Sequence, residues 1–596
     1  MPVYNAPVRD MKFVMQEMLN VGQLTDYEKY AEADTDTLDA ILEQSAKFTS
    51  EVLAPLNIVG DQEGCKRHED GSVTTPTGFK EAYQQVVEGG MMGLAQDPEY
   101  GGMGMPGVWH IAAGEMQSAA NMAFAMYPGL TNGAVAAIKI GGSDDQKNTF
   151  LPKMISGEWT GTMNLTEPHC GTDLGMLKTK AVPNPDGSYK ITGQKIFISA
   201  GEHDMSGNII HLCLARIEGA PAGVKGISLF IVPKFKLDAE GNAGERNPVT
   251  CGAIEHKMGI HGNSTCVMNY DEAEGYLIGE ENKGLKVMFV MMNRARLDVG
   301  MQGLAQSEVA YQNAVAYAQD RLQGRSLTGP KNENGPADPI IVHPDVRRML
   351  LETKAFNEGA RALVYWAALM EDLEGVHPDE KYREKADDYL GLLTPVIKGY
   401  LTDKAMATTI DCQQIFGGHG FIEEWGMSQF VRDTRIALIY EGANGIQALD
   451  LVGRKLARKG GRALMTLNSE IDAFLGENAD NENVAEFMGG LKDAKKKLTE
   501  GTMWMMQNGM TNPDNAGAGS VDYMHMMGLT TLAYMWAKMA LTAQAQIDAG
   551  SNDEYYTNKI ITGRYFVLRM LPMMDAHLAK IKTGAEPLMA LEAAAF

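Results

Sequence analysis

The hydrophobic period of the chain changes twice, and this order limits the possible folds more than any other feature. Apolar residues recur at spacings of three and four from about Thr35 to Lys153, which is typical of amphipathic helices. From Trp159 to about Gly279, short β-rich runs alternate with turn sequences such as PNPDGS, which predicts strands. Helical spacing returns near Asn282 and continues to the end of the 596-residue chain. Several domains are expected at this length.

The pattern predicts an α+β multidomain protein with a central antiparallel β domain between helical domains. Asp36 is a candidate N-cap of the first long helix. Hydrophilic interruptions at 476–486 and 511–520 divide the last helical part. The predicted division is an N-terminal extension (1–35), an N-terminal helical domain (36–158), a β domain (159–281), a helical bundle domain (282–459) and a C-terminal helical extension (460–596).

Charge and hydropathy exclude some partners. Lys and Arg number 53 and Asp and Glu 76, which gives a net charge of −23 and argues against nucleic acid and anionic membrane surfaces. The most apolar stretch, 524–541, is interrupted by His525 and Lys538, so no membrane insertion is expected. The first residues lack the basic and apolar regions of a secretory signal, which predicts a cytoplasmic protein.

The sulfur-containing residues indicate packing and not chemistry. The six cysteines are scattered without a CxxC pair, so we expect no structural zinc or other metal and no disulfide framework. Methionine is abundant, at 40 residues, with neighbouring pairs such as Met291-Met292 and Met526-Met527. Soft, adaptable core packing explains this abundance best.

The segment IALIYEGANGIQALDLVGRK, residues 436–455, contains the most informative acidic residue. Glu441 stands at the entrance of a predicted helix, where a carboxylate is more often a cap favoured by the helix dipole than a catalyst. Apolar neighbours such as Ile439 and Ile446 would partly desolvate the carboxylate, raise its pKa and make it a stronger base. The segment alone leaves both interpretations open.

Two further segments suggest a ligand-binding β surface. TMNLTEPHCGTD, residues 162–173, is a polar loop that leaves a strand and can offer backbone N–H groups and the Thr166 hydroxyl. In GQKIFISAG, residues 193–201, Phe197 and Ser199 are two apart and are expected to share a face. An ordinary hairpin with a cross-strand aromatic residue is the alternative.

Two glycine-containing segments are weaker signals. IFGGHGF, residues 415–421, allows close backbone approach to a phosphate or another subunit, although a helix ending at Gly417 is the simpler interpretation. RLQGR, residues 321–325, follows a long helical pattern, where cations also complement the helix dipole.

Together and in this order, the four segments resemble the acyl-CoA dehydrogenase family of flavoproteins. The motifs are TEP-x-x-G-[ST]-D, GQK-x-[WF]-I-[ST], Q-I-x-GG-x-G and YEG-x-x-x-IQ, and the similarity in layout covers about residues 36–458. The resemblance implies an acyl-CoA dehydrogenase-like fold, an FAD cofactor and an acyl-CoA substrate. Electrons would pass from reduced FAD to an electron-transfer flavoprotein.

The resemblance also implies roles for individual residues. Glu441 matches the catalytic base, and the position used by some relatives instead is Ala295 here. Arg296, Gly442 and Thr172 match positions near the acyl substrate. The positions matching FAD contacts are Met163, Leu165, Thr166, Thr172, Phe197 and Ser199, and, across a dimer interface, Arg321, Gln323, Gln414, Gly417 and Gly418.

Some positions depart from the family pattern. RLQGR lacks the aromatic residue that often precedes its Gly, and Ala443 and Gly445 stand where shorter relatives often have Thr and Gln. His169 and Cys170 replace small residues, and a packed thiol is expected at Cys170. These departures concern adenosine binding and leave the expected chemistry unchanged.

The implied reaction is the oxidation of an acyl-CoA to a trans-2-enoyl-CoA. Glu441 removes the α-proton while the β-hydrogen leaves as hydride to the flavin, and hydrogen bonds from the Glu441 N–H and a flavin ribityl hydroxyl stabilise the thioester oxygen. An acyl-CoA oxidase of the same fold would differ by forming peroxide. A non-catalytic DNA-binding flavoprotein of this fold is disfavoured by the negative charge and by Glu441.

The chain length and three local sequence segments narrow the choice of acyl-CoA substrate. The residues beyond 460 resemble the extra domain of long members, which implies a homodimer. The N-terminus, residues 255–284 and YEGANGIQALDLVGRK resemble a long subgroup that acts on 3-methylmercaptopropionyl-CoA in dimethylsulfoniopropionate demethylation. A short- or medium-chain fatty acyl-CoA is the alternative substrate.

Overall fold

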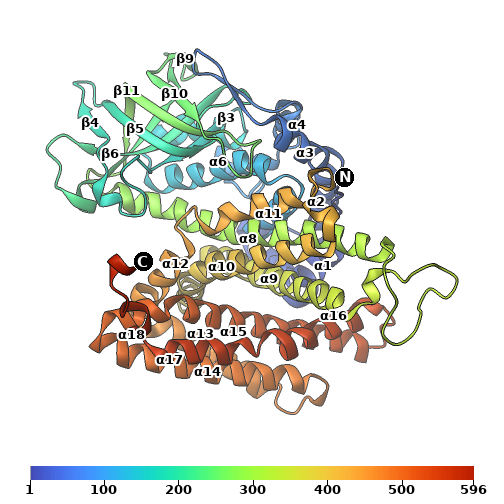
Figure 1. Cartoon of the computed structure of the whole chain (residues 1–596). Helices are drawn as coiled ribbons and strands as arrows, with labels where there is room; N and C mark the ends of the chain where they lie inside the picture. The colour runs from blue at the N-terminus through green and yellow to red at the C-terminus, as the bar shows by residue number, and fades with distance from the viewer. Residues whose placement is uncertain (1) are drawn as a thin grey trace. The chain divides into compact units, whose positions relative to one another are not determined.

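The fold is given by a computed structural model that describes residues 2–596, and these form two compact units. The helical unit contains the residues up to Glu43, Pro106–Glu115 and Val299–Phe596. The β unit contains Gln44–Met105 and Met116–Asp298. Figure 1 labels the elements of both units.

Helices of the N-terminal part match the expected period. Helix α2 begins at Thr35, and the Asp34 carboxylate accepts a hydrogen bond from the Thr37 N–H (2.7 Å), so Asp34 and not Asp36 caps this helix. The remaining main helices of this part are α1 (Val8–Lys12), α3 (Ala54–Glu63), α4 (Phe79–Glu88), α5 (Gly107–Ala120), α6 (Met122–Gly141) and α7 (Asp144–Ile155).

The β unit is built around a seven-stranded sheet with the order β10-β11-β5-β4-β6-β3, in which β7 also pairs with β11 and β6. Strand β6 pairs in parallel with both β3 and β4, whereas the other neighbours are antiparallel, so the expected antiparallel sheet is in fact mixed. The strands are β3 (Trp159–Asn164), β4 (Lys180–Pro183), β5 (Tyr189–Ser199), β6 (Asn208–Ile217), β7 (Ser228–Pro233), β10 (Val249–Ile254) and β11 (Thr265–Ile278). Two short hairpins pair β1 (Lys66–Arg67) with β2 (Val73–Thr74) and β8 (Phe235–Leu237) with β9 (Ala243–Arg246).

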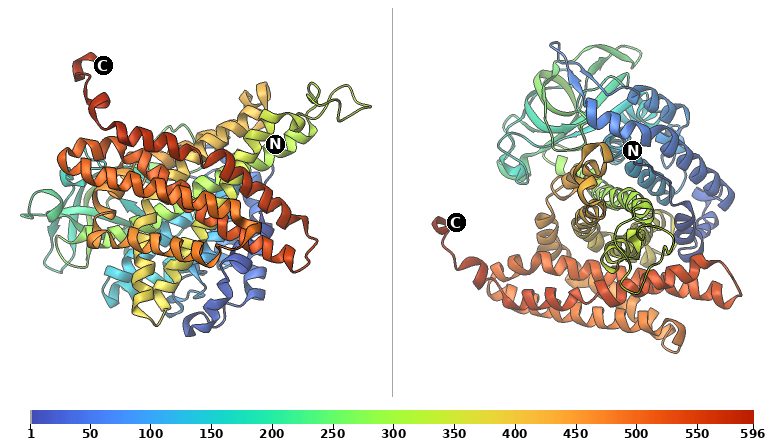
Figure 2. Two further views of the ribbon diagram at one scale, coloured as in Figure 1. Left: turned by 90° about the horizontal axis from the view of Figure 1, so that it is seen from below. Right: turned by 45° about the vertical axis from the view of Figure 1, so that its right-hand side comes forward.

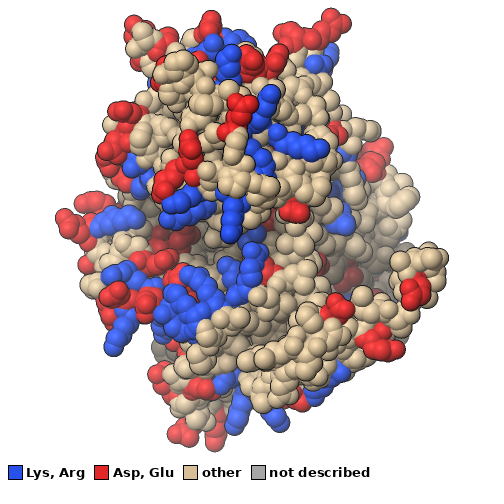
Figure 3. Space-filling view, turned by 90° about the vertical axis from the view of Figure 1, so that its left-hand side faces the viewer, with Lys and Arg blue, Asp and Glu red and all other residues tan. Residues whose placement is uncertain are grey.

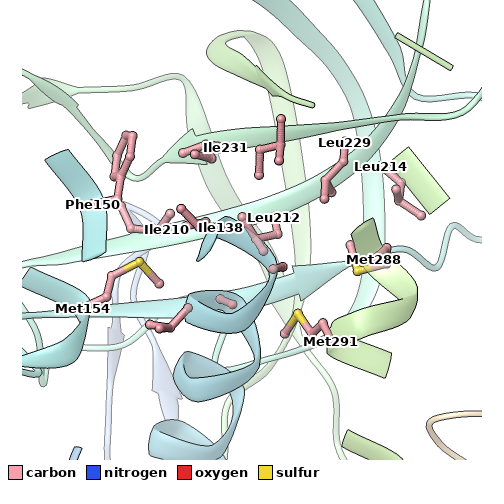
Figure 4. Packing of buried hydrophobic residues seen from close by; sticks show 14 of the residues in the cluster. Ile138, Phe150, Met154, Ile210, Leu212, Leu214, Leu229, Ile231, Met288 and Met291 are labelled. Atoms are coloured by element: carbon pink, nitrogen blue, oxygen red, sulfur yellow. The ribbon is translucent and has the colours of Figure 1, made fainter. Parts of the chain in front are cut away.

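Helices cover one face of this sheet and form a core with it. Figure 1 shows α6 against the strands, and Figure 4 shows Ile138, Phe150 and Met154 of α6 and α7 facing residues of β6 and β7. Met288 and Met291, from the first turns of α8 (Gly284–Asp320), complete the cluster. The methionines therefore fill gaps between strands and helices, as predicted.

The helical unit contains the long helices expected from the sequence. They are α8 from Val299 onward, α9 (Pro344–Val376) and α10 (Glu380–Ile415), followed by the shorter α11 (Met427–Arg435) and α12 (Asn444–Asp450). The C-terminal helices α13 (Arg462–Glu477), α14 (Ala485–Thr511), α15 (Pro513–Asp548), α16 (Glu554–Tyr565), α17 (Met573–Thr583) and α18 (Glu586–Met589) follow. Figure 2 shows α14, α15 and α17 lying side by side, and α15 also packs on α9, α10 and α12.

One expected interruption is much shorter than predicted. Helix α15 begins at Pro513, and the Asn512 side chain caps it by accepting from the Asp514 N–H (3.0 Å). The glycines at 517 and 519 therefore lie inside a helix. The loop between α13 and α14 falls where the other interruption was predicted.

Charges are interspersed on the face in Figure 3. In the basic run 454–462, Arg458 and Lys459 each approach Asp387 at 3.4 Å, and Arg462 approaches Asp388 at 2.7 Å. Within residues 2–596 no helix is long and apolar enough to span a membrane. Over the same residues, no three His, Cys, Asp or Glu side chains are grouped as a metal site.

Candidate active site

Strand β3 presents one face of the candidate site. Thr162 and Asn164 are fully buried, whereas the alternating Met163 and Leu165 are partly exposed, together with Thr166 just after the strand. Because successive side chains of a strand point to opposite faces, one set of side chains is buried in the protein and the other is accessible to a ligand. The predicted flavin-contacting residues of this segment lie on the accessible side.

Phe197 stands at an irregularity that the sequence pattern did not predict. The register between β11 and β5 shifts between Ile198 and Lys195, and Phe197 has a left-handed backbone with φ of 59°. This bulge turns the ring outward, and Phe197 exposes 60% of its surface while Ser199 is partly exposed. A cross-strand aromatic residue would instead be covered by its neighbours. An exposed ring beside the polar Thr166 loop suits the flat face of a heterocycle.

A buried ion pair joins the TEP loop to the GQK strand, and we did not predict it. Lys195 Nζ donates to Glu167 Oε1 (2.9 Å) and to the Leu165 carbonyl (3.0 Å), and both charged residues are almost fully buried. The backbone N–H groups of Lys178 and Thr179 also donate to Glu167. Burial raises the pKa of Glu167, but Lys195 and these donors outweigh it and hold the pKa below its usual value. The Glu of TEP and the Lys of GQK, one charged residue of each sign in the two motifs, are the sequence feature from which this ion pair could have been predicted.

Behind β3 lies a buried polar chain. Thr162 Oγ1 is 2.8 Å from His211 Nδ1, and Asn164 Nδ2 donates to Thr162 Oγ1 (2.7 Å). Tyr270 donates to Asn164 Oδ1 (2.9 Å). Burial and the charge of Lys234 lower the pKa of His211 to about 3, so this histidine is neutral. These hydrogen bonds fix the buried side of β3, the strand that carries Met163.

The loop after TEP contains the remaining β-unit positions. Thr172 is exposed and accessible to a ligand, whereas Cys170 is 3% exposed and packs in the core, as predicted. The His169 ring lies 3.1 Å from the Met176 carbonyl and so anchors the loop. Arg296, on α8 of the same unit, is 7% exposed.

Glu441 lies in a strained turn of the helical unit. Glu441 and Gly442 are both left-handed, with φ of 56° and 89°, between the turn Ile436–Leu438 and helix α12. The N-cap of α12 is Ala443, which makes no side-chain cap hydrogen bond. Glu441 is therefore not the N-cap residue of this helix. Non-glycine left-handed residues cost about 1–2 kcal/mol and concentrate at functional sites.

Buried side chains hold this turn. Lys398 Nζ, on α10, donates to the Gly442 carbonyl (2.7 Å), and Gln447 Nε2 donates to the carbonyls of Glu441 and Gly442 (both 3.1 Å). Lys398 and Gln447 are fully buried. Ile439, one of the apolar neighbours of Glu441 in sequence, exposes 50% of its surface. Glu441 itself is partly exposed.

An aromatic cluster joins the RLQGR and GGHG segments. Tyr317, near the end of α8, stacks on Phe416 (4.1 Å between centroids) and its hydroxyl lies 2.9 Å from His419 Nδ1. Trp425 stacks on His419 (4.3 Å). Gly417 has a left-handed φ of 56° just after α10. The cluster brings together five exposed predicted positions: Arg321, Gln323, Gln414, Gly417 and Gly418.

Comparison with protein families decides the classification. The acyl-CoA dehydrogenase N-terminal, middle and C-terminal domains match residues 35–158, 162–273 and 282–456, and an acetyl-CoA dehydrogenase C-terminal-like domain matches 467–592. The chain belongs to the acyl-CoA dehydrogenase family. It is an acyl-CoA dehydrogenase, and thus an FAD-dependent oxidoreductase.

The similarity to known proteins extends over nearly the whole chain. The 3-methylmercaptopropionyl-CoA dehydrogenase of Ruegeria pomeroyi is 43% identical over 98% of this chain and 99% of its own length. A butyryl-CoA dehydrogenase of Syntrophomonas wolfei is 36% identical over 98% of this chain and 97% of its own. An acyl-CoA dehydrogenase of Bacillus anthracis, solved with FAD, shares the fold with a TM-score of 0.75 at 23% identity, covering 94% of this chain and 90% of that chain.

Proposed function

We propose that this acyl-CoA dehydrogenase oxidises 3-methylmercaptopropionyl-CoA to its trans-2-enoyl-CoA, with Glu441 as the catalytic base. The observation that supports the base assignment is the turn itself, in which Glu441 has a left-handed backbone and stands two residues before Ala443, the N-cap residue of α12. The substrate assignment is supported by the 43% identity with the Ruegeria enzyme along nearly the whole chain. Butyryl-CoA is the second candidate, because a relative of that name is 36% identical.

The turn suits proton abstraction from a weak carbon acid. The Glu441 carboxylate would accept the α-proton, and its backbone N–H would donate to the thioester oxygen as negative charge develops there. The rigid hold by Lys398 and Gln447 fixes both groups before substrate binds. Gly442, Thr172 and the buried Arg296 would line the acyl site.

The β unit fits the cofactor. Met163, Leu165, Thr166, Thr172, Phe197 and Ser199 would hold FAD, and the exposed Phe197 ring supplies an aromatic surface for it. When bound, FAD supplies the acceptor for the β-hydrogen and its electrons. Arg321, Gln323, Gln414, Gly417 and Gly418 would reach the FAD of a second subunit in a homodimer. We further propose an electron-transfer flavoprotein as the electron acceptor and a cytoplasmic location.

An anaerobic titration tests the reaction and its substrate. Purified protein is mixed in parallel with 3-methylmercaptopropionyl-CoA, butyryl-CoA and octanoyl-CoA while the flavin absorbance is followed. Fast bleaching is expected, with the highest rate per concentration for 3-methylmercaptopropionyl-CoA. A higher rate with butyryl-CoA would assign the second candidate, and bound flavin that none of the three reduces would contradict the acyl class.

The variant Glu441→Gln tests the base. It keeps the size of the side chain and one acceptor oxygen, but the amide cannot take up a proton at neutral pH. FAD is expected to stay bound at one per chain while reduction by acyl-CoA is lost. Substantial remaining reduction would show that another residue is the base.

A further inference from the structure

We propose that the C-terminal helical domain sets the geometry of the turn at Glu441 and Gly442, through a hydrogen-bonded network that runs from the partly buried His525 and Asp403 to the buried Asn444 and Lys398. The inference rests on the proposed role of Glu441 and adds positioning residues to it. All of these residues belong to the helical unit.

Lys398 is the end of the chain nearest to the turn. Its ammonium, fully buried on α10, donates to the Gly442 carbonyl (2.7 Å) and to Asn444 Oδ1 (2.8 Å). A buried cation is kept where it is well paired, since its desolvation is costly. Any displacement of Lys398 therefore acts on the peptide unit between Gly442 and Ala443, one residue after Glu441.

Asn444 ties this ammonium to the next turn of α10. Its Nδ2 lies 2.7 Å from Asp403 Oδ1, 2.9 Å from Thr402 Oγ1 and 3.0 Å from the Gly399 carbonyl. Asn444 is the first residue of α12 and is 8% exposed. The amide thus fixes the start of α12, and with it the direction in which the catalytic turn enters the helix.

The hydrogen-bonded side chains continue into the C-terminal domain at His525. His525 Nε2, on α15, lies 2.9 Å from Asp403 Oδ2, the second oxygen of the carboxylate that faces Asn444. The His525 ring packs at the edge of Tyr400 (5.3 Å) and of His577 on α17 (5.2 Å). Three side chains, those of Asp403, Asn444 and Lys398, therefore connect His525 on α15 to the turn.

Close helix packing makes this contact rigid. A Cβ on Gly399 would lie 2.4 Å from Met524 Sδ, and a Cβ on Gly528 would lie 2.3 Å from the Tyr400 ring. Glycine at both positions lets α10 and α15 approach directly beside Lys398 and His525. Because packed interiors do not deform continuously, the position of α15 is transmitted to α10 and α12.

The test measures proton abstraction alone. An acyl-CoA analogue with sulfur in place of the β-carbon can lose its α-proton but cannot give up a β-hydride. Exchange of this α-proton in D2O, followed by mass spectrometry, reports on the base without flavin reduction. Asp403→Ala is expected to lower the exchange rate about 10- to 100-fold, the cost of a misplaced catalytic group, with the dissociation constant of the analogue unchanged.

Matched variants make the result specific. Asp403→Asn keeps an acceptor for Asn444 and is expected to restore exchange close to the wild-type rate, whereas His525→Leu is expected to behave like Asp403→Ala. Tyr565→Phe is the control, because it removes other hydrogen bonds of the C-terminal domain, to the Arg348 carbonyl (3.2 Å) and Glu352 Oε2 (3.4 Å), and changes none of the four residues of the proposed network.

The outcomes separate the two proposals. Wild-type exchange in folded Asp403→Ala and His525→Leu, with Glu441→Gln inactive, would overturn the positioning role and leave the base assignment intact. An equal loss in Tyr565→Phe would also overturn it, because the effect would then be general destabilisation. Continued exchange in Glu441→Gln would overturn the base assignment, and the positioning role with it.

Discussion

At the scale of single residues, the left-handed backbone is the clearest mark of the Glu441–Gly442 turn, which we propose as the catalytic turn. Gly442 has φ of 89°, and in Gly442→Ala an added Cβ would strain this left-handed position by about 1–2 kcal/mol. We expect a lower thermal midpoint and slower reduction by acyl-CoA. Differential scanning fluorimetry and stopped-flow absorbance measure the two effects.

Gly445→Ala is the matched control three residues further on. Gly445 lies within α12, and a Cβ there would meet no atom within 4 Å. Alanine in a helix is favoured over glycine by about 0.5–1 kcal/mol, so this variant is expected to be unchanged or slightly more stable. Equal losses in both variants would show that the left-handed turn is not the cause.

The lowered pKa of His211 leads us to expect that the stability of the β unit falls at acid pH. Its pKa of about 3 lies below the ordinary value of 6.5, because of burial and the Lys234 charge, so the unfolded chain takes up this proton more readily than the folded chain. The contribution to stability is present above pH 6.5 and is lost progressively as pH falls from 6.5 toward 3. Between pH 6.5 and pH 5 the loss amounts to about 2 kcal/mol.

The variant His211→Gln removes the His211 contribution to this dependence, whereas His203, whose pKa burial and the Lys234 charge also lower to about 3, keeps its own contribution. The thermal midpoint of the wild type is expected to fall toward that of the variant as pH drops from 7 to 5. His68→Gln, at a partly exposed histidine hydrogen-bonded to Thr74, should keep the wild-type pH dependence. A constant difference between wild type and His211→Gln over this range would refute the prediction.

At the scale of elements, the buried pair Glu167–Lys195 joins a loop to a strand. Lys195→Met leaves a buried carboxylate without its cation, which is expected to cost about 3–5 kcal/mol and to release FAD. Adding Glu167→Gln removes the unpaired charge and keeps an acceptor for one of the two N–H groups of Lys178 and Thr179, which donate to different carboxylate oxygens. The double variant should therefore recover part of the loss, measured by thermal unfolding and flavin content.

A surface pair provides the comparison. Lys236 and Glu245 are 2.8 Å apart, but the Glu245 side chain is 76% exposed. Lys236→Met is expected to change stability by less than about 1 kcal/mol. A double variant of the buried pair no better than Lys195→Met alone would show that the charge itself is not what destabilises the single variant.

Elements also differ in how far sequence predicts them. The helices α9 and α10 follow from long periodic stretches, and the structure confirms both. The bulge at Phe197 was not predictable, because it depends on the register of β11 against β5 and not on the alternation within β5. The helical start at Pro513 was missed because local polar composition favours a loop, whereas packing of α15 on α14 and α17 decides for helix.

At the scale of the whole molecule, the proposed homodimer gives a direct test. Exposed apolar residues such as Phe421 (86%) and Leu327 (87%) lie in the segments that carry Gln414, Gly418 and Gln323. We expect light scattering after size exclusion to give about twice the chain mass of 64.8 kDa. A monomer or a tetramer would contradict the proposal. The predicted domain boundaries also remain to be tested, for example by limited proteolysis.

The sequence by itself determined the order of helical and β regions and the family, and it predicted Glu441 as the base, because periodicity and short motifs are properties of neighbouring residues. Only the tertiary structure decided what holds those motifs. Lys195 meets Glu167, and Lys398 meets Gly442, across separations of 28 and 44 residues. Such contacts depend on how elements pack, since a buried charge is fixed by the partner that the fold brings to it and not by its neighbours in the chain.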